Sequence, residues 1–354
     1  MSHPVDNMDS IPYEPEAATS SHPLTIVHRG DKPERPPYLV PLFDLADLAA
    51  ARKHAQSLEK DVSQRLEAIL SRLAQAKRWR PLTAAVHPNH VLALKQSFPN
   101  FAEVLEELAM HLVLARLADK DQAALAIPPI LLVGPPGVGK TFFAGKLCDT
   151  LGAAFWETSL SSNSAGFMLS GLDMSWSGGK PGLVFRALLE SPAANPFILL
   201  DEIDKANSES KSEPLGPLYS LLETHTAQRF RDEAVTLPMD AGHILWMATA
   251  NDASSIPEPL LSRMTVFEIP LPNAEQSARI VHGIWRNLRE TSTWGRYLYP
   301  TLSDAVIQRL QGESPRSMGK LLTRAAGRAI LSKRQTLMPD DVRSAMSQVR
   351  RIGF

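Results

Sequence analysis

Residues 134–141 read GPPGVGKT, and this stretch decides the fold. It matches the phosphate-binding pattern G-x-x-x-x-G-K-[ST] over its full length. The apolar run 130–133 precedes it and a helical pattern follows it, which is the strand–loop–helix context that the pattern requires. Gly134, Gly137 and Gly139 let backbone N–H groups approach phosphate oxygens closely, and the helix start favours negative charge. The stretch therefore predicts a nucleotide phosphate site.

The side chains that end this stretch predict how the phosphates are held. Lys140 is placed to bridge the β- and γ-phosphates, and the Thr141 hydroxyl is placed to ligate Mg²⁺. The expected nucleotide-binding residues are Gly134, Pro135, Pro136, Gly137, Val138, Gly139, Lys140, Thr141 and Phe142.

A second acidic site is expected where residues 197–204 read FILLDEID. The apolar part predicts a strand that delivers Asp201 and Glu202 at its C-terminal end, where parallel sheets gather ligands. Asp201 is expected to hold Mg²⁺, and Glu202 to orient and activate the attacking water. The adjacent glutamate favours hydrolysis over simple nucleotide storage. Because no NKxD motif occurs, ATP is favoured over GTP as the nucleotide.

Composition excludes little but sets the context. The chain has 354 residues, 44% of them hydrophobic, with 37 Lys+Arg against 38 Asp+Glu. That balance does not demand a nucleic-acid or anionic-membrane partner. Cys148 is the lone cysteine, so no internal disulfide can form and a cytoplasmic location is expected. No apolar run approaches the length of a membrane span, and no signal-peptide order opens the chain, so no membrane association is expected.

The chain divides into segments of different pattern. Residues 1–40 lack an apolar period and predict a disordered tail, and residues 41–100 predict a helical region. Residues 101–271 begin with a helix to about Ala118 and then alternate strands with helices, as in a parallel α/β sheet, whereas residues 272–354 are mostly helical.

One helical stripe in the second segment has two interpretations. Between Leu42 and Arg80, apolar residues recur at helical spacing on one face, and Asp44 is placed to cap the start. The face is either a surface for a partner or a stripe packed on the protein's own core. The stripe consists of Leu58, Val62, Leu66, Ile69 and Leu73.

Three further stretches carry a family resemblance. Residues 244–252 read ILWMATAND, residues 259–264 read PLLSRM, and residues 314–322 read SPRSMGKLL. Together with the phosphate loop and the acidic strand, they resemble the AAA+ ATPases, and among those the ATPase module of the Lon proteases. The stretch RFRDEAVTLPMD, residues 229–240, is also similar to Lon. The resemblance covers about residues 128–349.

The resemblance implies roles for single residues. Asn251 corresponds to the sensor-1 residue, which positions water against the γ-phosphate, and Arg316 to the sensor-2 arginine of the lid. Arg263 corresponds to the arginine finger, which reaches the ATP of the next subunit. Its planar charged fork suits the spreading negative charge of phosphoryl transfer.

The resemblance also implies a fold and an assembly. The expected fold is an α/β AAA+ domain with a P-loop and a parallel sheet, preceded by N-terminal helices and followed by a small helical lid, with ATP between domain and lid. Self-association into a hexameric ring is implied as well. Lon carries a C-terminal protease domain, but this sequence ends at Phe354 soon after the lid. We therefore expect a motor without its own peptidase.

Residues 175–183, SWSGGKPGL, suggest where such a motor grips its substrate. In Lon, an aromatic residue followed by a glycine-containing loop projects into the central pore, and Trp176 matches that position. Lon usually has tyrosine there. Gly178, Gly179 and Gly182 are expected to let the loop swing with the nucleotide state.

Three functions remain open from the sequence. The first is a chaperone-like motor that remodels or unfolds a protein substrate. The second is a nucleic-acid motor or loader, which is not favoured because only Lys180 adds positive charge beside Trp176. The third is an ATP-dependent switch or adaptor that acts on a partner through the helical stripe of residues 42–80.

Overall fold

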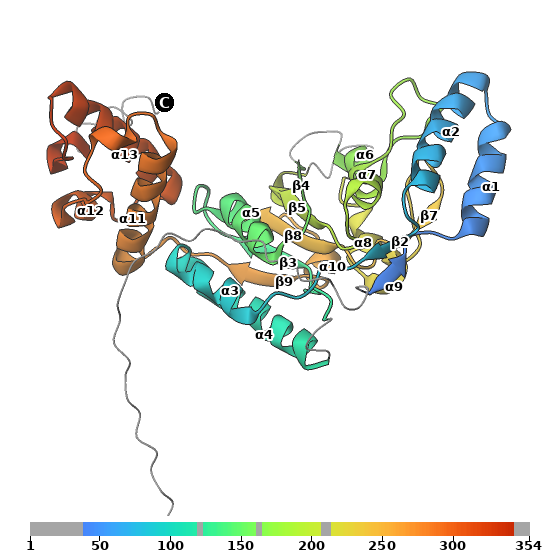
Figure 1. Ribbon diagram of the computed structural model, residues 1–354, viewed down its shortest axis with the longest axis horizontal. Helices are drawn as coiled ribbons and strands as arrows, with labels where there is room; N and C mark the ends of the chain where they lie inside the picture. The colour runs from blue at the N-terminus through green and yellow to red at the C-terminus, as the bar shows by residue number, and fades with distance from the viewer. Residues whose placement is uncertain (1–37, 119–122, 161–164, 207–213, 343–354) are drawn as a thin grey trace, which may run out of the picture. The chain divides into compact units, whose positions relative to one another are not determined.

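A five-stranded parallel sheet lies at the centre of the computed structural model (Figure 1). Its strand order is β4-β5-β8-β3-β9, and each neighbouring pair runs parallel. Because helices cover both faces of such a sheet, its inner strands read as continuous apolar runs. The strands are β3 (Ile130–Val133), β4 (Phe155–Ser159), β5 (Phe197–Asp201), β8 (Leu245–Ala250) and β9 (Thr265–Glu268).

The structure describes residues 38–118, 123–160, 165–206 and 214–342. Of the expected disordered tail, residues 1–37 lie outside the described residues. Within the described ranges, no helix has both the length and the apolar character needed to cross a bilayer.

One face of the sheet is covered by helices that come before and after the phosphate loop. Ile130 and Leu132 of β3 point into this layer, where Phe101 stacks on Phe143 with ring centroids 4.2 Å apart. The helix expected from Phe101 to Ala118 is confirmed. The elements here are α3 (Pro88–Ala93), η1 (Leu94–Gln96), η2 (Pro99–Phe101), α4 (Ala102–Ala118) and α5 (Lys140–Leu151).

Cys148 of α5 lies in this same layer. Its side chain is buried, and burial raises the pKa of the thiol to about 12. Burial and a raised pKa both disfavour the thiolate form, so Cys148 has the surroundings of a small core residue.

The opposite face of the sheet carries short helices and a small β-hairpin. Leu131 points toward this layer, so successive residues of β3 serve the two layers alternately. The elements are α6 (Ala165–Ser170), α7 (Leu183–Glu190), η3 (Ile203–Lys205), α8 (Leu218–Leu221), α9 (Thr224–Ala227), β6 (Phe230–Arg231), β7 (Pro238–Met239) and α10 (Glu258–Leu261).

The N-terminal helical region is a pair of helices instead of the single helix predicted between Leu42 and Arg80. The chain turns after Gln56, and Leu58 lies in the turn. Strands at the two ends pair antiparallel and bring the ends of the segment together, so two shorter helices can pack side by side. Asp44 occupies the N-cap position, but its carboxylate accepts a hydrogen bond from Arg78 (2.8 Å) instead of capping the helix. The elements are β1 (Leu39–Pro41), α1 (Leu45–Gln56), α2 (Lys60–Gln75) and β2 (Trp79–Pro81).

The apolar stripe of α2 packs on the protein's own core. Leu66, Leu70 and Leu73 expose 2% or less of their surface and belong to the cluster that also holds Leu131 and Leu200 of the sheet. Of the two interpretations of this stripe, core packing is correct, and the stripe itself is not a free surface.

The C-terminal helices have a core of their own. Trp285 and Met318 are fully buried in it, and Asn273 opens the first helix with a capping box to Gln276. The predicted architecture, a parallel α/β part followed by a helical part, is confirmed. The elements are α11 (Ala274–Thr291), η4 (Gly295–Tyr297), α12 (Asp304–Leu310) and α13 (Pro315–Leu331).

Candidate nucleotide-binding site

The loop between β3 and α5 has the backbone geometry of a phosphate cradle. Gly137 and Gly139 have φ of 81° and 107°, a region that residues with a Cβ rarely adopt. At Gly134 an added Cβ would lie 2.3 Å from the carbonyl oxygen of Ile269, so that position also requires glycine. Gly139 ends the loop in the left-handed conformation, and α5 starts at Lys140. The loop therefore points free backbone donors outward from the start of a helix.

Lys140 lies at the centre of the site and is 7% exposed. Its ammonium group donates to the carbonyl oxygens of Gly134 (2.6 Å) and Pro135 (3.3 Å) and to Oδ1 of Asn251 (3.2 Å). Burial lowers the pKa of Lys140, and the nearby carboxylates, led by Asp201, oppose that change. A buried cation thus stands between the loop and the ends of the strands.

The acidic strand end meets the loop directly. The hydroxyl of Thr141 donates to Oδ1 of Asp201 across 3.0 Å, and the hydroxyl of Thr249 donates to the same oxygen across 2.5 Å. Thr249 also accepts a hydrogen bond from the backbone N–H of Glu202 (3.0 Å). The two residues expected to hold Mg²⁺ are therefore neighbours, and Thr249 links both acidic residues.

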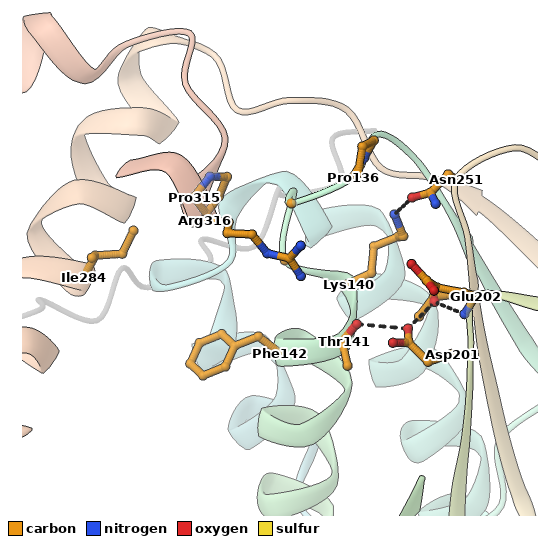
Figure 2. A pocket seen from close by; sticks show the side chains of 13 residues that line it. Pro136, Lys140, Thr141, Phe142, Asp201, Glu202, Asn251, Ile284, Pro315 and Arg316 are labelled. Carbon is orange, nitrogen blue, oxygen red and sulfur yellow. Dashed lines mark hydrogen bonds between the residues drawn. The ribbon is translucent and has the colours of Figure 1, made fainter. Parts of the chain in front are cut away.

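Glu202 has a strained backbone. Its φ is 55° and its ψ is 49°, the left-handed region that costs a non-glycine residue about 1–3 kcal/mol. The surroundings hold this conformation through the hydrogen bond to Thr249, and the Glu202 side chain lines the same cavity as Lys140 and Thr141 (Figure 2). Strain of this kind typically marks residues that are placed for function.

Two residues beyond the acidic pair complete the strand-end cluster. Asn251 follows β8, and its backbone N–H donates to Oδ2 of Asp204 (3.1 Å) while its side chain accepts from Lys140. Sequence reasoning missed Asp204 and Thr249. Asp204 is the last letter of FILLDEID and offered a signal, whereas Thr249 looks like an ordinary strand residue.

Arg316 approaches the loop from the lid. Its backbone N–H donates to the carbonyl oxygen of Gly137 (3.3 Å), and its side chain points into the cavity (Figure 2). The cavity measures about 490 Å³, large enough for a nucleotide's phosphates. It is lined by Pro136, Gly137, Gly139, Lys140, Thr141, Phe142, Asp201, Glu202, Thr249, Asn251, Ile284, Pro315 and Arg316.

A second, more apolar cavity of about 310 Å³ adjoins the first. The two share Phe142 and Ile284, which lie on the lid side of the site in Figure 2. Val138 lines the second cavity only and is itself buried. Charged space for phosphates and apolar space beside it together match the two chemical halves of a nucleotide.

Two expected site residues lie away from these cavities. Arg263 follows α10, and its guanidinium forms an ion pair with Glu223 (2.6 Å) and donates to the carbonyl oxygen of Pro259. Trp176 lies in the loop between α6 and α7 and exposes 66% of its surface. Within a single chain, neither contributes to the lining of the cavity.

The side-chain oxygens of Thr141 and Asp201, at the end of the acidic strand, suit Mg²⁺. Mg²⁺ favours oxygen ligands, and it usually takes only one or two protein carboxylates and completes its shell with waters and phosphate oxygens. Thr141 and Asp201 present one hydroxyl and one carboxylate side by side. In the part of the chain that the structure describes, no three His, Cys, Asp or Glu side chains gather as a metal cage would require.

Comparisons with known proteins agree with this geometry. Residues 130–271 match the model of the ATPase family associated with various cellular activities (AAA). The chain is 33% identical to a Lon protease of Halothermothrix orenii over 190 residues. This alignment covers 53% of this chain and 24% of that protein. Over 153 residues, the chain is 36% identical to the peroxisomal Lon protease homolog 2 of Spinacia oleracea, covering 43% of this chain and 17% of the relative.

The chain therefore spans only a minor part of the length of these relatives. Among solved structures, the Thermotoga maritima RuvB P216G mutant aligns with a TM-score of 0.46 and 18% identity, over 69% of this chain and 70% of that one.

Proposed function

Since this chain carries an ATPase domain of the AAA family that is related to the Lon proteases, we propose that it hydrolyses ATP with Mg²⁺ and remodels a protein substrate. The observation that carries hydrolysis is the joining of two motifs that lie far apart in sequence. Thr141 of the phosphate loop bonds to Asp201, and Glu202 stands next to it in the same cavity.

In this proposal each residue of the site has a chemical task. The loop amides and Lys140 bind the phosphates, and Thr141 and Asp201 hold Mg²⁺, which when bound neutralises charge on the phosphate oxygens. Glu202 accepts hydrogen bonds from the attacking water and orients it toward the γ-phosphate. Asn251 positions the same water, while Arg316 binds phosphate from the lid side.

The adjoining apolar cavity supports ATP as a complete ligand. Phosphates at the loop place the nucleoside toward Phe142 and Ile284, which line both cavities. A planar base fits between such side chains, and the exposed Asn287 adds an amide group for polar contacts, whereas the amide of Asn100 in the same lining already donates to the carbonyl oxygen of Pro270.

The contacts of Arg263 support a site completed by assembly. The guanidinium lies outside the cavity of its own chain, on a segment that begins at α10. An arginine in that position serves ATP hydrolysis if it reaches the nucleotide of a neighbour. We therefore include a hexameric ring in the proposal. A cytoplasmic location is also included, because the lone Cys148 leaves no internal disulfide for an oxidising compartment to form.

Exposure of Trp176 supports a polypeptide as the substrate. A large flat side chain that is 66% exposed at a loop tip can pack against an extended chain with little sequence preference. We expect Trp176→Ala to abolish the stimulation of ATP hydrolysis by an unfolded protein such as reduced, carboxymethylated lactalbumin. Stimulation by single-stranded DNA in its place, steeply reduced by salt, would favour the nucleic-acid motor.

The direct test of hydrolysis is Glu202→Gln. The amide keeps the shape of the side chain but removes the base, so turnover should fall by about 10²–10⁴-fold while ATP still binds. Glu290→Gln, an exposed acid of α11, is the matched control and should behave as wild type. Binding measured by a fluorescent ATP analogue and turnover measured by phosphate release separate the two effects. Wild-type turnover in Glu202→Gln would refute the assignment of Glu202.

A further inference from the structure

Trp176 stands on a short closed loop, residues 172–182, which we call the Trp176 loop. Leu172 and Lys180 exchange two backbone hydrogen bonds of 3.0 Å each and close its base. Inside it, the N–H of Trp176 bonds to the carbonyl oxygen of Asp173 (3.1 Å), and Gly179 bonds back to Trp176 (2.9 Å). The loop is therefore an ordered unit with the indole at its tip.

Buried Asp232 holds the end of this loop. It is 1% exposed; its Oδ2 accepts from the N–H of Gly182 (2.7 Å), and its Oδ1 accepts from the N–H of Ala234 (2.9 Å). The next residue, Glu233, donates its N–H to Ser170, just before the loop begins (2.7 Å). The segment between β6 and β7 thus binds the chain on both sides of the Trp176 loop.

The glycines around the loop serve close packing. A Cβ at Gly179 would lie 2.4 Å from the carbonyl oxygen of Asp173, and one at Gly182 would lie 2.3 Å from that of Leu169. A Cβ at Gly171 would lie 2.5 Å from Asp232. Gly179 and Gly182 are therefore needed for contact of backbone with backbone, and the expectation that Gly178, Gly179 and Gly182 let the loop swing with the nucleotide state stays a prediction.

Arg65 of α2 holds the other arm of the loop. Its Nη2 donates to the carbonyl oxygen of Met174 across 2.8 Å, and its Nε lies 3.2 Å from the exposed carboxylate of Asp61 without forming a hydrogen bond to it. The neighbouring Leu66 and the later Leu70 fix α2 to the core, so Arg65 extends from a rigid base. A charged donor on a carbonyl oxygen is among the stronger hydrogen bonds in proteins.

We infer that Arg65 and Asp232 are positioning residues that hold the Trp176 loop in the orientation in which Trp176 grips a polypeptide. This inference rests on the proposed function of Trp176. It makes α2 part of the substrate-handling apparatus, because α2 supplies one of the two side chains that hold the loop, Arg65, while Asp232 is the other.

Arg65 offers the cleaner test, since Asp232 is buried and its loss endangers folding. Arg65→Met keeps the apolar stem and removes the donors, whereas Arg65→Lys keeps one donor. Arg72→Met on the same helix is the matched control, because Arg72 is exposed and pairs with Glu190 across 3.7 Å. All variants are made in the full chain.

The first measurement is hydrogen–deuterium exchange of the peptide that spans residues 172–182. Arg65→Met should exchange about tenfold faster there, the size expected for loss of one charge-assisted hydrogen bond. Arg65→Lys should restore part of the protection, and Arg72→Met should match wild type. Unchanged exchange in Arg65→Met overturns the inference.

The second measurement is ATP turnover against the concentration of reduced, carboxymethylated lactalbumin. Arg65→Met should raise the half-saturating concentration of lactalbumin by about tenfold with turnover at saturation retained, and Arg65→Lys should recover part of this shift. In one outcome, Arg65→Met shows wild-type exchange and wild-type half-saturation, while Trp176→Ala loses stimulation. This outcome overturns the positioning role of Arg65 but supports the role of Trp176 in gripping the polypeptide. Faster exchange in Arg65→Met with full stimulation in Trp176→Ala supports positioning and refutes the grip.

Discussion

Thr249 joins the two acidic residues of the site through one hydroxyl group. It donates to Asp201 and accepts from the backbone of Glu202, whose left-handed conformation it helps to hold. The register of the sheet explains the contact, because Leu200 pairs with Ala248 and the next residues along both strands then lie side by side. Sequence alone gives no sign of this role, since threonine is common in strands for its shape.

Replacing Thr249 by valine tests that role, because the substitution removes only the hydroxyl group. Valine has the same shape but leaves the half-buried N–H of Glu202 without the Thr249 hydroxyl, a loss of about 0.5–1.5 kcal/mol. We expect turnover to fall by about tenfold or more and ATP affinity to change little. Thr150→Val, which removes an exposed hydroxyl of α5 bonded within its own helix, is the control. Stopped-flow measurements give the ATP affinity of both variants, and steady-state phosphate release gives their turnover. Equal turnover in Thr249→Val and Thr150→Val would show that the Thr249 hydroxyl does not support hydrolysis.

At the scale of elements, the sequence predicts best where one local pattern decides the structure. The strand Ile130–Val133, the loop after it and the strand that delivers Asp201 lie where their patterns placed them, because glycine geometry and a buried apolar run leave few alternatives. The break at Leu58 escaped prediction, because no proline or glycine marks it. The antiparallel pairing of β1 with β2 brings the two ends of the segment together and so requires a turn between them. The spacing of apolar residues along the chain does not predict such pairing between distant strands.

The packing of α2 yields a prediction for the N-terminal helices. Leu70 is fully buried among residues of the sheet layer, so Leu70→Ala should lower the free energy of unfolding by about 2–5 kcal/mol. Leu45→Ala, at the start of α1 and 59% exposed, should change it by less than about 0.5 kcal/mol. Thermal and urea unfolding followed by circular dichroism compare the two. Equal stability of both variants would make α1 and α2 a detachable partner module, as the switch hypothesis requires.

At the scale of the whole molecule, Arg263 is the residue that a single chain leaves without a catalytic partner. Its guanidinium rests on Glu223, and its Nε is buried without a hydrogen bond among the described side chains. The resemblance to AAA+ ATPases identified this arginine, but one chain cannot show which nucleotide it serves. Only an assembly experiment separates action within a chain from action between chains.

Mixing two inactive variants answers that question. Arg263→Ala keeps an intact pocket but lacks the finger, whereas Glu202→Gln keeps the finger but lacks the base. If Arg263 acts on a neighbour, turnover should fall by about 10³-fold or more in Arg263→Ala alone and by about 10²–10⁴-fold in Glu202→Gln alone, and it should reappear when the two are mixed. An intact pocket then lies beside an intact finger in part of the mixed rings. Arg309→Ala, an exposed arginine of α12, should stay active alone and serves as the control. If phosphate release from the mixture stays at the sum of the two variants, Arg263 acts within its own chain or not at all, and the shared site is wrong.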